Sequence, residues 1–343
     1  MQFSVTFKPK QVTKKLLGVL PSRERDVLTG RYGLGNTVKR DTLETIGSRY
    51  TITRERVRQI ENRAIGAIRT SPAYKESAAV FTELSGIIVD MGGIVPEQEL
   101  LDAISKNEGL QNHIHFLLVV GNEFERLKED PEFNHRWHAD QGIADSVHTA
   151  LRNLYRSLSN DDLVPEQELI ARFLKDLVHL DKKHHTHDTA RRWLSLSKKI
   201  SRNQLGEWGR VDAPGVRVKN MRDMAYLSLK RHGSPMHFAE VARSISELFG
   251  RKAHEATCHN ELIKDERFVL VGRGLYALSE WGYSKGVVKE VIKDILKKDG
   301  PLSKKEIIDR VKRERYVKDG TILVNLQDAE MFNRTSDGKY TAV

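Results

Sequence analysis

The sequence has a single cysteine, Cys258, and aromatic residues fill only 7% of its 343 positions. One cysteine excludes an intramolecular disulfide and any cysteine-rich zinc site. No apolar run is long enough to span a bilayer. The start, MQFSVTFKPKQVTKKLLGVLP, lacks the apolar core and small-residue cleavage site of a secretory signal. These absences predict a cytoplasmic protein with no membrane contact.

Catalytic motifs are absent as well. No nucleophile stands beside a base in a known motif, and no paired carboxylates have a recognisable context. The histidine-rich segment HLDKKHHTHD (179–188) fits no established zinc spacing, and its basic neighbours disfavour a cation. We therefore expect a protein that is not an enzyme and that holds no metal or cofactor.

Charge is distributed unevenly along the chain, whose formal net charge is +10. Residues 1–72 have fifteen Lys and Arg against six Asp and Glu, a net charge of +9, whereas residues 73–140 have a net charge of −8. A compact basic segment is typical of a protein that binds a polyanion, although a solvated basic surface has the same composition. The acidic segment is expected to contact protein, either RNA polymerase or the chain's own basic domain.

An internal repeat follows the basic segment. The segment GIVPEQELLDAI (93–104) recurs as DLVPEQELIARF (162–173). Weaker copies are GSPMHFAEVARSI (233–245) and GPLSKKEIIDRV (300–311). An aromatic residue follows each proline by about forty positions; these residues are Trp137, Trp208, Tyr276 and Tyr340. Each unit reads as a helix, a second helix with proline in its first turn, a third helix and a strand pair, which is a winged helix.

The expected fold is therefore mainly α, with a helix-turn-helix domain and tandem winged helices with small β-hairpin wings. The predicted domains are residues 1–72, 73–140, 141–218, 219–283 and 284–343. The unit at 219–283 also resembles the HARE-HTH winged helix, through GSPMHFAEVARSI and DERFVLVGRGLYALS, and this resemblance implies contact with nucleic acid or the transcription machinery. Possible wing contacts to DNA are Arg273, Arg334 and Lys339, although ordinary solvated hairpins would look the same.

The segment DTLETIGSRYTITRERVRQIENRAIGAIR (41–69) has the pattern of a helix-turn-helix. Asp41 with Glu44 fits a capping box at the first helix, Gly47 permits a close helix approach, and Thr53 suits the N-cap of the second helix. The second helix has one apolar face, made by Val57, Ile60, Ala64, Ile65 and Ile68.

That face leaves Arg54, Glu55, Arg58 and Gln59 outward at the start of the second helix, where a helix-turn-helix reads base edges. Arg can bond guanine, Gln adenine, and Glu the amino group of cytosine. The alternative is a solvated helix surface with ion pairs such as Glu55 with Arg58.

The run LPSRERDVLTGRYGLG (20–35) followed by TLETIGSRYTITRERVRQIENRAIGAIR resembles the C-terminal DNA-binding domain of primary bacterial sigma factors. The resemblance implies recognition of a −35-type promoter element and docking on the β flap of core RNA polymerase. It also implies that Arg54, Glu55, Arg58 and Gln59 face the bases. Four further residues would lie near phosphates: Arg23, Arg31, Thr53 and Arg56.

About twenty residues precede the matched part, so we expect the promoter-melting domain of a sigma factor to be missing. The favoured interpretation is a sequence-specific transcription factor with double-stranded promoter DNA and RNA polymerase as partners. A DNA-organising or repressor protein independent of polymerase stays open. So does the specificity arm of a restriction-type system, because HARE-type modules also accompany restriction enzymes.

Overall fold

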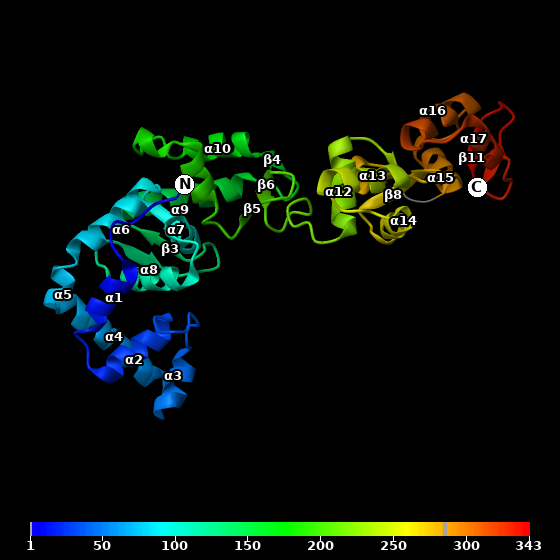
Figure 1. The fold of residues 1–343 in the computed structure, drawn as a ribbon. Coiled ribbons are helices and arrows are strands. Elements are labelled where there is room, and N and C mark those ends of the chain that lie inside the picture. Colours follow the sequence, from blue (N-terminus) through cyan, green and yellow to red (C-terminus); the bar gives the residue numbers. More distant parts are fainter. Residues whose placement is uncertain (1, 284–286) are drawn as a thin grey trace. The chain divides into compact units, whose positions relative to one another are not determined.

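The computed structural model describes residues 2–283 and 287–343 and is mainly α-helical, with small antiparallel sheets. The chain divides into two compact units, one made of Met1–Ser159 with Val164–Ser201 and the other of Asn160–Leu163 with Arg202–Val343. Figure 1 follows the chain from its blue amino-terminal helices to its red carboxy-terminal hairpin. Over the described residues, no helix combines the length and the apolar character that a membrane crossing requires.

The basic segment folds into a small helical domain that contains the predicted helix-turn-helix. Its elements are α1 (Pro9–Leu17), α2 (Ser22–Tyr32), α3 (Leu43–Tyr50), α4 (Arg54–Thr70) and the single turn α5 (Pro72–Lys75). Thr51 takes the left-handed conformation at φ 55°, which turns the chain between α3 and α4. The Thr53 hydroxyl accepts a hydrogen bond from the amide of Arg56 at 3.2 Å, so the predicted N-cap of α4 is confirmed.

The capping box predicted at Asp41 and Glu44 is wrong, because neither residue makes the N-cap contact of α3. The N-cap is Thr42, whose hydroxyl accepts from the Thr45 amide at 3.1 Å. The Asp41 carboxylate instead pairs with the Arg49 guanidinium at 2.7 Å. A threonine and an aspartate side by side are both good caps, and the ion pair with Arg49 decides between them.

Gly47 is the point of closest approach between α3 and the chain that follows it. A Cβ at this position would lie 2.6 Å from the carbonyl oxygen of Ile52, a backbone atom that cannot rotate away. Gly66 in the middle of α4 is different, since a Cβ there would meet nothing within 4 Å. The close approach after α3 therefore requires glycine at position 47, whereas α4 has room for a side chain at position 66.

The four repeat units share one order of helices and end in a strand pair, and the first three also have a short strand before the second helix. The first is α6 (Ala78–Asp90), β1 (Ile94–Pro96), α7 (Glu97–Ile104), α8 (Glu108–Val120), β2 (Glu125–Leu127) and β3 (Arg136–His138). The second is α9 (Gln141–Ser157), β4 (Val164–Pro165), α10 (Glu166–Lys175), the 3-10 turn η1 (Lys182–His184), α11 (His187–Leu194), β5 (Ile200–Arg202) and β6 (Glu207–Arg210). Its hairpin, indistinct in the sequence, is therefore present.

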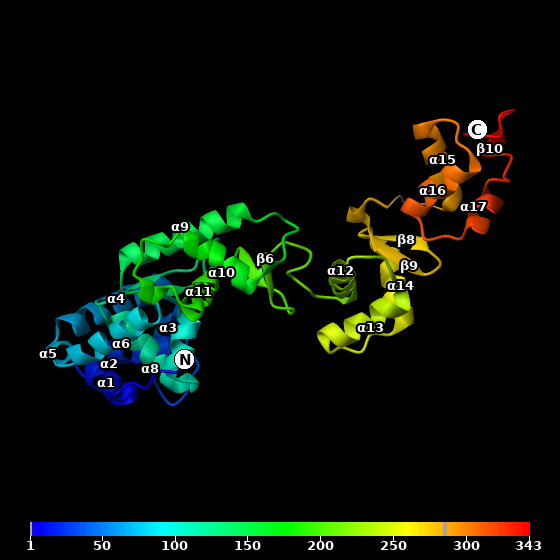
Figure 2. The same ribbon diagram turned by 90° about the horizontal axis from the view of Figure 1, so that it is seen from above.

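The same order continues in the second compact unit, and Figure 2 shows its two parts from above. The third repeat is α12 (Met221–His232), β7 (Met236–His237), α13 (Phe238–Phe249), α14 (Glu255–Lys264), β8 (Phe268–Gly272), β9 (Leu275–Leu278) and the 3-10 turn η2 (Ser279–Trp281). The fourth is α15 (Val288–Asp299), α16 (Lys304–Glu314), α17 (Asp319–Asn325), β10 (Phe332–Arg334) and β11 (Tyr340–Ala342).

The repeated proline and aromatic residues have structural roles. Trp137 pairs with Val95 across β3 and β1, and Tyr276 pairs with Met236 across β9 and β7. All four repeated aromatics are buried in their units. Pro96 is the N-cap of α7, one position before the first helical turn where we predicted it. Pro96 and Pro165 thus each end a short strand and start a helix, whereas His237 and Ser303 are the N-caps in the third and fourth repeats. The aromatic side chain joins the core in each repeat.

The helix-turn-helix domain and the first repeat share one apolar core. Leu28 of α2 and Ile68 of α4 are buried in the same cluster as Phe116 and Leu117 of α8. The Tyr32 ring packs edge-on against the Phe116 ring, with centroids 5.4 Å apart. Figure 1 shows α8 beside α1 and next to α4. The acidic segment therefore contacts the chain's own basic domain, which was one of the two partners expected for it.

Hydrogen bonds fix the same junction. Arg69, near the end of α4, donates to the carbonyl oxygens of Val119, Val120 and Gly121 at 3.0, 3.0 and 3.2 Å. The buried Asn112 amide of α8 donates to the carbonyl oxygen of Val38 at 2.7 Å. Buried polar groups that are paired in this way hold two elements in one register.

We predict that Ile68→Ala destabilises α4 and α8 together. Removing this buried side chain costs roughly 2–5 kcal/mol, and the two helices share the core around it. Hydrogen exchange should accelerate in peptides from both helices and stay unchanged in α13. The matched control is Val178→Ala, because Val178 is 73% exposed. Faster exchange in α4 alone would contradict a shared core.

We also predict opposite effects for two glycine substitutions in the helix-turn-helix. Gly47→Ala should destabilise the domain by roughly 1–3 kcal/mol through the clash with the Ile52 carbonyl. Gly66→Ala, with open space around it, should stabilise α4 by up to about 1 kcal/mol through helix propensity. Urea unfolding of the two variants measures both changes in the free energy of unfolding. Equal changes would show that the turn tolerates a Cβ at position 47.

Candidate nucleic-acid interface

The first two turns of α4 present polar side chains to solvent and two apolar side chains, Val57 and Ile60, to the core. Val57 is fully buried, in a small cluster with Val27 of α2 and Ile46 of α3. The residues predicted to read bases are all exposed: Arg54, Glu55, Arg58 and Gln59. Because the buried side chain fixes the rotation of α4, these four residues face away from the domain.

The exposed side chains are ordered by contacts with one another. Arg58 donates two hydrogen bonds to the Glu55 carboxylate, at 2.9 and 2.7 Å, and Arg56 donates to the Gln59 amide oxygen at 3.0 Å. The hydrogen bond from Arg58 lowers the pKa of Glu55, so this carboxylate is ionised at neutral pH. The ion pair weighed as the alternative to base reading is thus present, and it leaves both groups exposed to a partner.

The four residues predicted near phosphates lie on α2 and at the start of α4. Arg23 on α2 is exposed, with its guanidinium 5.4 Å from the centre of the Tyr50 ring. Arg31 is half-buried and lies 3.6 Å from the Glu61 carboxylate, so part of its charge is used within the domain. Thr53 caps α4, and Arg56 is exposed one turn along.

The predicted wing residues lie in hairpins of the second compact unit. Arg273 is exposed in the turn between β8 and β9, where Gly274 has a φ of 73°. Arg334 at the end of β10 and Lys339 just before β11 are exposed in the last hairpin. The structure thus gathers the eight base and phosphate candidates in the first unit and leaves the wing candidates in the second.

The structure also contains a cleft that the sequence analysis missed. It has a volume of about 600 Å³ and lies between the helix-turn-helix domain and the first repeat. The basic residues that line it are Arg31, Arg40, Arg58, Arg69, Arg126 and Lys128, against the two acidic residues Glu61 and Glu125. The sequence offered a weak signal, since Arg126 and Lys128 are basic residues in a strongly acidic segment.

One wall of the cleft rests on a buried polar network. The Glu97 carboxylate accepts hydrogen bonds from Arg126 at 2.6 and 2.8 Å and from the Trp137 indole at 2.9 Å, and His115 lies 3.6 Å away. Desolvation raises the pKa of Glu97, but the neighbouring His115 and Arg126 outweigh it and hold that pKa well below its usual range. The ionised carboxylate fixes Arg126 at the edge of the hairpin.

The histidine-rich segment 179–188 is built into the second repeat. His184 is buried, and the His185 ring lies 2.9 Å from the Leu177 carbonyl oxygen. Among residues 2–283 and 287–343, no three His, Cys, Asp or Glu side chains are grouped as metal ligands.

Comparison with known proteins places the helix-turn-helix domain in a family. Residues 16–70 match the family described as Sigma-70, region 4. Over 56 residues the chain is 50% identical to RNA polymerase sigma factor SigA of Nostoc sp., which is 16% of this chain and 14% of that protein. It is also 43% identical over 60 residues to RNA polymerase sigma factor SigA of Clostridium acetobutylicum, or 18% of this chain and 16% of that protein.

The matched part is a small share of both proteins, and the chain spans about one-seventh of the length of these relatives. It coincides with the end of α1 and with α2, α3 and α4, the elements that position the exposed residues described above. Residues 16–70 are therefore a sigma-70 region 4 domain, a DNA-binding helix-turn-helix, and over this part of its length the protein is related to sigma factors.

Proposed function

We propose that this protein is a DNA-binding transcription factor that reads a −35-type promoter element with α4 and contacts RNA polymerase. The observation that supports it most directly is the exposed set Arg54, Glu55, Arg58 and Gln59 at the start of a capped helix. A helix-turn-helix places that part of its second helix in the major groove. In the proposal, Arg58 and Glu55 exchange their mutual ion pair for base contacts.

The proposed phosphate contacts come from residues around that helix. Arg23 and Arg56 are exposed cations, Arg56 bonds the reading residue Gln59, and the amino-terminal end of α4 favours negative charge. These contacts fix the position of the helix on the duplex without reading sequence. The basic winged-helix units, including the HARE-HTH-like unit at 219–283, would extend contact through Arg273, Arg334 and Lys339.

Contact with polymerase is proposed because the relatives are named as RNA polymerase sigma factors. One observation favours the second candidate, a DNA-organising protein or repressor that acts without polymerase. The apolar side of the helix-turn-helix domain is occupied by α8 of the same chain. A polymerase element therefore has to bind an exposed surface of the domain or displace α8.

The two candidates differ in one titration. Binding should be measured at fixed salt on duplexes with and without a −35-type hexamer, with and without core RNA polymerase. The proposed function requires a preference for the hexamer that polymerase strengthens. Preference without any effect of polymerase would favour the repressor, and binding with no preference would favour the DNA-organising protein.

Substitutions should separate base reading from phosphate contact. Arg58→Ala is expected to lose roughly 1–3 kcal/mol of discrimination at one base pair, because Arg58 would read a base edge. Arg23→Ala should weaken binding to hexamer and random duplexes by the same factor, since a phosphate has no sequence information. If Arg58→Ala also weakens both duplexes equally, the assignment of Arg58 to the bases is wrong.

A further inference from the structure

The basic cleft lies along one face of α4 and reaches the residues proposed to read DNA. Arg58, Asn62, Ile65 and Arg69 all line it, and this spacing places them on one side of the helix over about 16 Å of its axis. The opposite wall comes from α8 and from the hairpin of β2 and β3. Because Arg58 belongs both to the cleft and to the exposed start of α4, the two surfaces are continuous.

The cleft has an excess of positively charged side chains. Residues 73–140 contain five Lys and Arg against thirteen Asp and Glu, yet the wall they form presents Arg126 and Lys128 beside Glu125. With the helix-turn-helix side included, six basic residues oppose two acidic ones. A concave surface with an excess of one charge concentrates the potential and attracts the opposite charge. The acidic segment thus places two of its five basic side chains in this cleft, next to α4.

The basic side chains of the cleft differ in whether other groups of the protein already bond them. Arg126 is bonded to Glu97, and the Arg40 guanidinium donates to the Asn112 amide oxygen at 2.8 Å. Desolvation lowers the pKa of Arg40, and repulsion by Arg126 lowers it further. Lys128 differs, because it is exposed and its carbonyl oxygen accepts a hydrogen bond from Arg136 at 3.1 Å, while no described residue bonds its ammonium. The ammonium of Lys128 is therefore the group most available to an anion.

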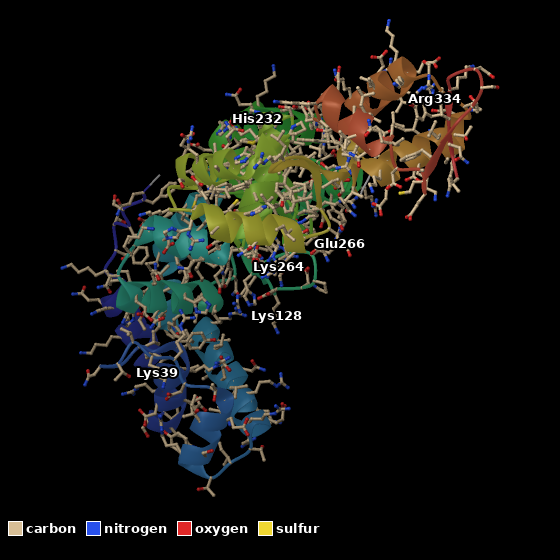
Figure 3. All side chains as sticks on the ribbon, turned by 90° about the vertical axis from the view of Figure 1, so that its right-hand side faces the viewer. Lys39, Lys128, His232, Lys264, Glu266 and Arg334 are labelled. Carbon is tan, nitrogen blue, oxygen red and sulfur yellow. The ribbon has the colours of Figure 1, made fainter. Side chains whose placement is uncertain are left out.

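The position of Lys128 relative to α4 is fixed. Arg69 bonds the end of α8 to α4, and the shared core prevents the two parts from moving independently. Figure 3 shows Lys128 at the edge of the teal first repeat, on the side of the blue helix-turn-helix domain. The cleft thus lies between elements that share one core and one set of hydrogen bonds.

We infer that this cleft binds the sugar–phosphate backbone of DNA next to the site read by α4, with Lys128 contacting a phosphate from the first winged-helix repeat. The inference rests on the proposed function, since it requires α4 to meet DNA. An acidic peptide has similar charge, but continuity with Arg58 and with the half-buried Arg31 favours the molecule that α4 itself binds. The helix-turn-helix and the adjoining repeat would then form one DNA-binding surface.

Salt dependence provides the first test. Each phosphate contact contributes a slope of about −0.9 to the logarithm of the binding constant against that of salt concentration, so Lys128→Ala should reduce the slope by about 0.9. The loss of affinity should be equal on hexamer and random duplexes. Lys75→Ala is the matched control, because Lys75 is also an exposed lysine of this segment but lies in α5, beyond the other end of α4. Lys128→Arg should keep the wild-type slope.

Neutral methylphosphonates, placed one at a time along the duplex, then locate the contact. Wild-type protein should lose affinity at one or two phosphates outside the hexamer, and Lys128→Ala should be insensitive at those positions only. Unchanged slope and phosphate sensitivity in Lys128→Ala, with normal hexamer preference, would overturn this inference and leave the proposed function intact. Weaker polymerase binding with unchanged DNA binding would overturn it in favour of a protein occupant. A wild-type protein that binds no DNA would refute both.

Discussion

The packing of α8 against the helix-turn-helix domain is the interaction on which the rest of the first compact unit depends. Leu28, Ile68 and Phe116 share one core across the junction, and Arg69 satisfies three carbonyl groups at the end of α8. Covering this apolar side removes it from water, which is the main source of stability in a small helical domain. The same packing turns the opposite, polar side of α4 toward solvent.

This arrangement gives the acidic repeat a role that its net charge does not suggest. A segment with a charge of −8 beside a basic reading helix could screen that helix from DNA. The structure keeps the two apart, since the start of α4 is exposed and the contact is made by the apolar α8. Where the repeat does approach α4, it presents Arg126 and Lys128 beside a single acidic residue, Glu125. Charge distribution, and not net charge, therefore decides what the segment contributes.

The repeats place the same elements at the same points for a physical reason. In the first two repeats a proline caps the second helix, and because it lacks the amide that a longer strand would need, the preceding strand stays short. The aromatic residue on the last strand then covers the place where the short strand pairs, as Trp137 does with Val95. A sequence period of nearly seventy residues is thus a structural unit in which each part completes one small core.

The sequence alone determined the helix-turn-helix, the repeated order of elements and the exposed face of α4, because these depend on local patterns. The spacing of Val57, Ala64 and Ile68 defines the buried side of the helix, and Thr53 defines its start. The cap at Thr42 instead of Asp41 depended on an ion pair with Arg49, eight residues along the chain from Asp41. Only the tertiary structure decided that α8 covers the domain and that Arg40, Arg69 and Lys128 meet in one cleft, since those contacts join residues far apart in sequence and no local pattern encodes them.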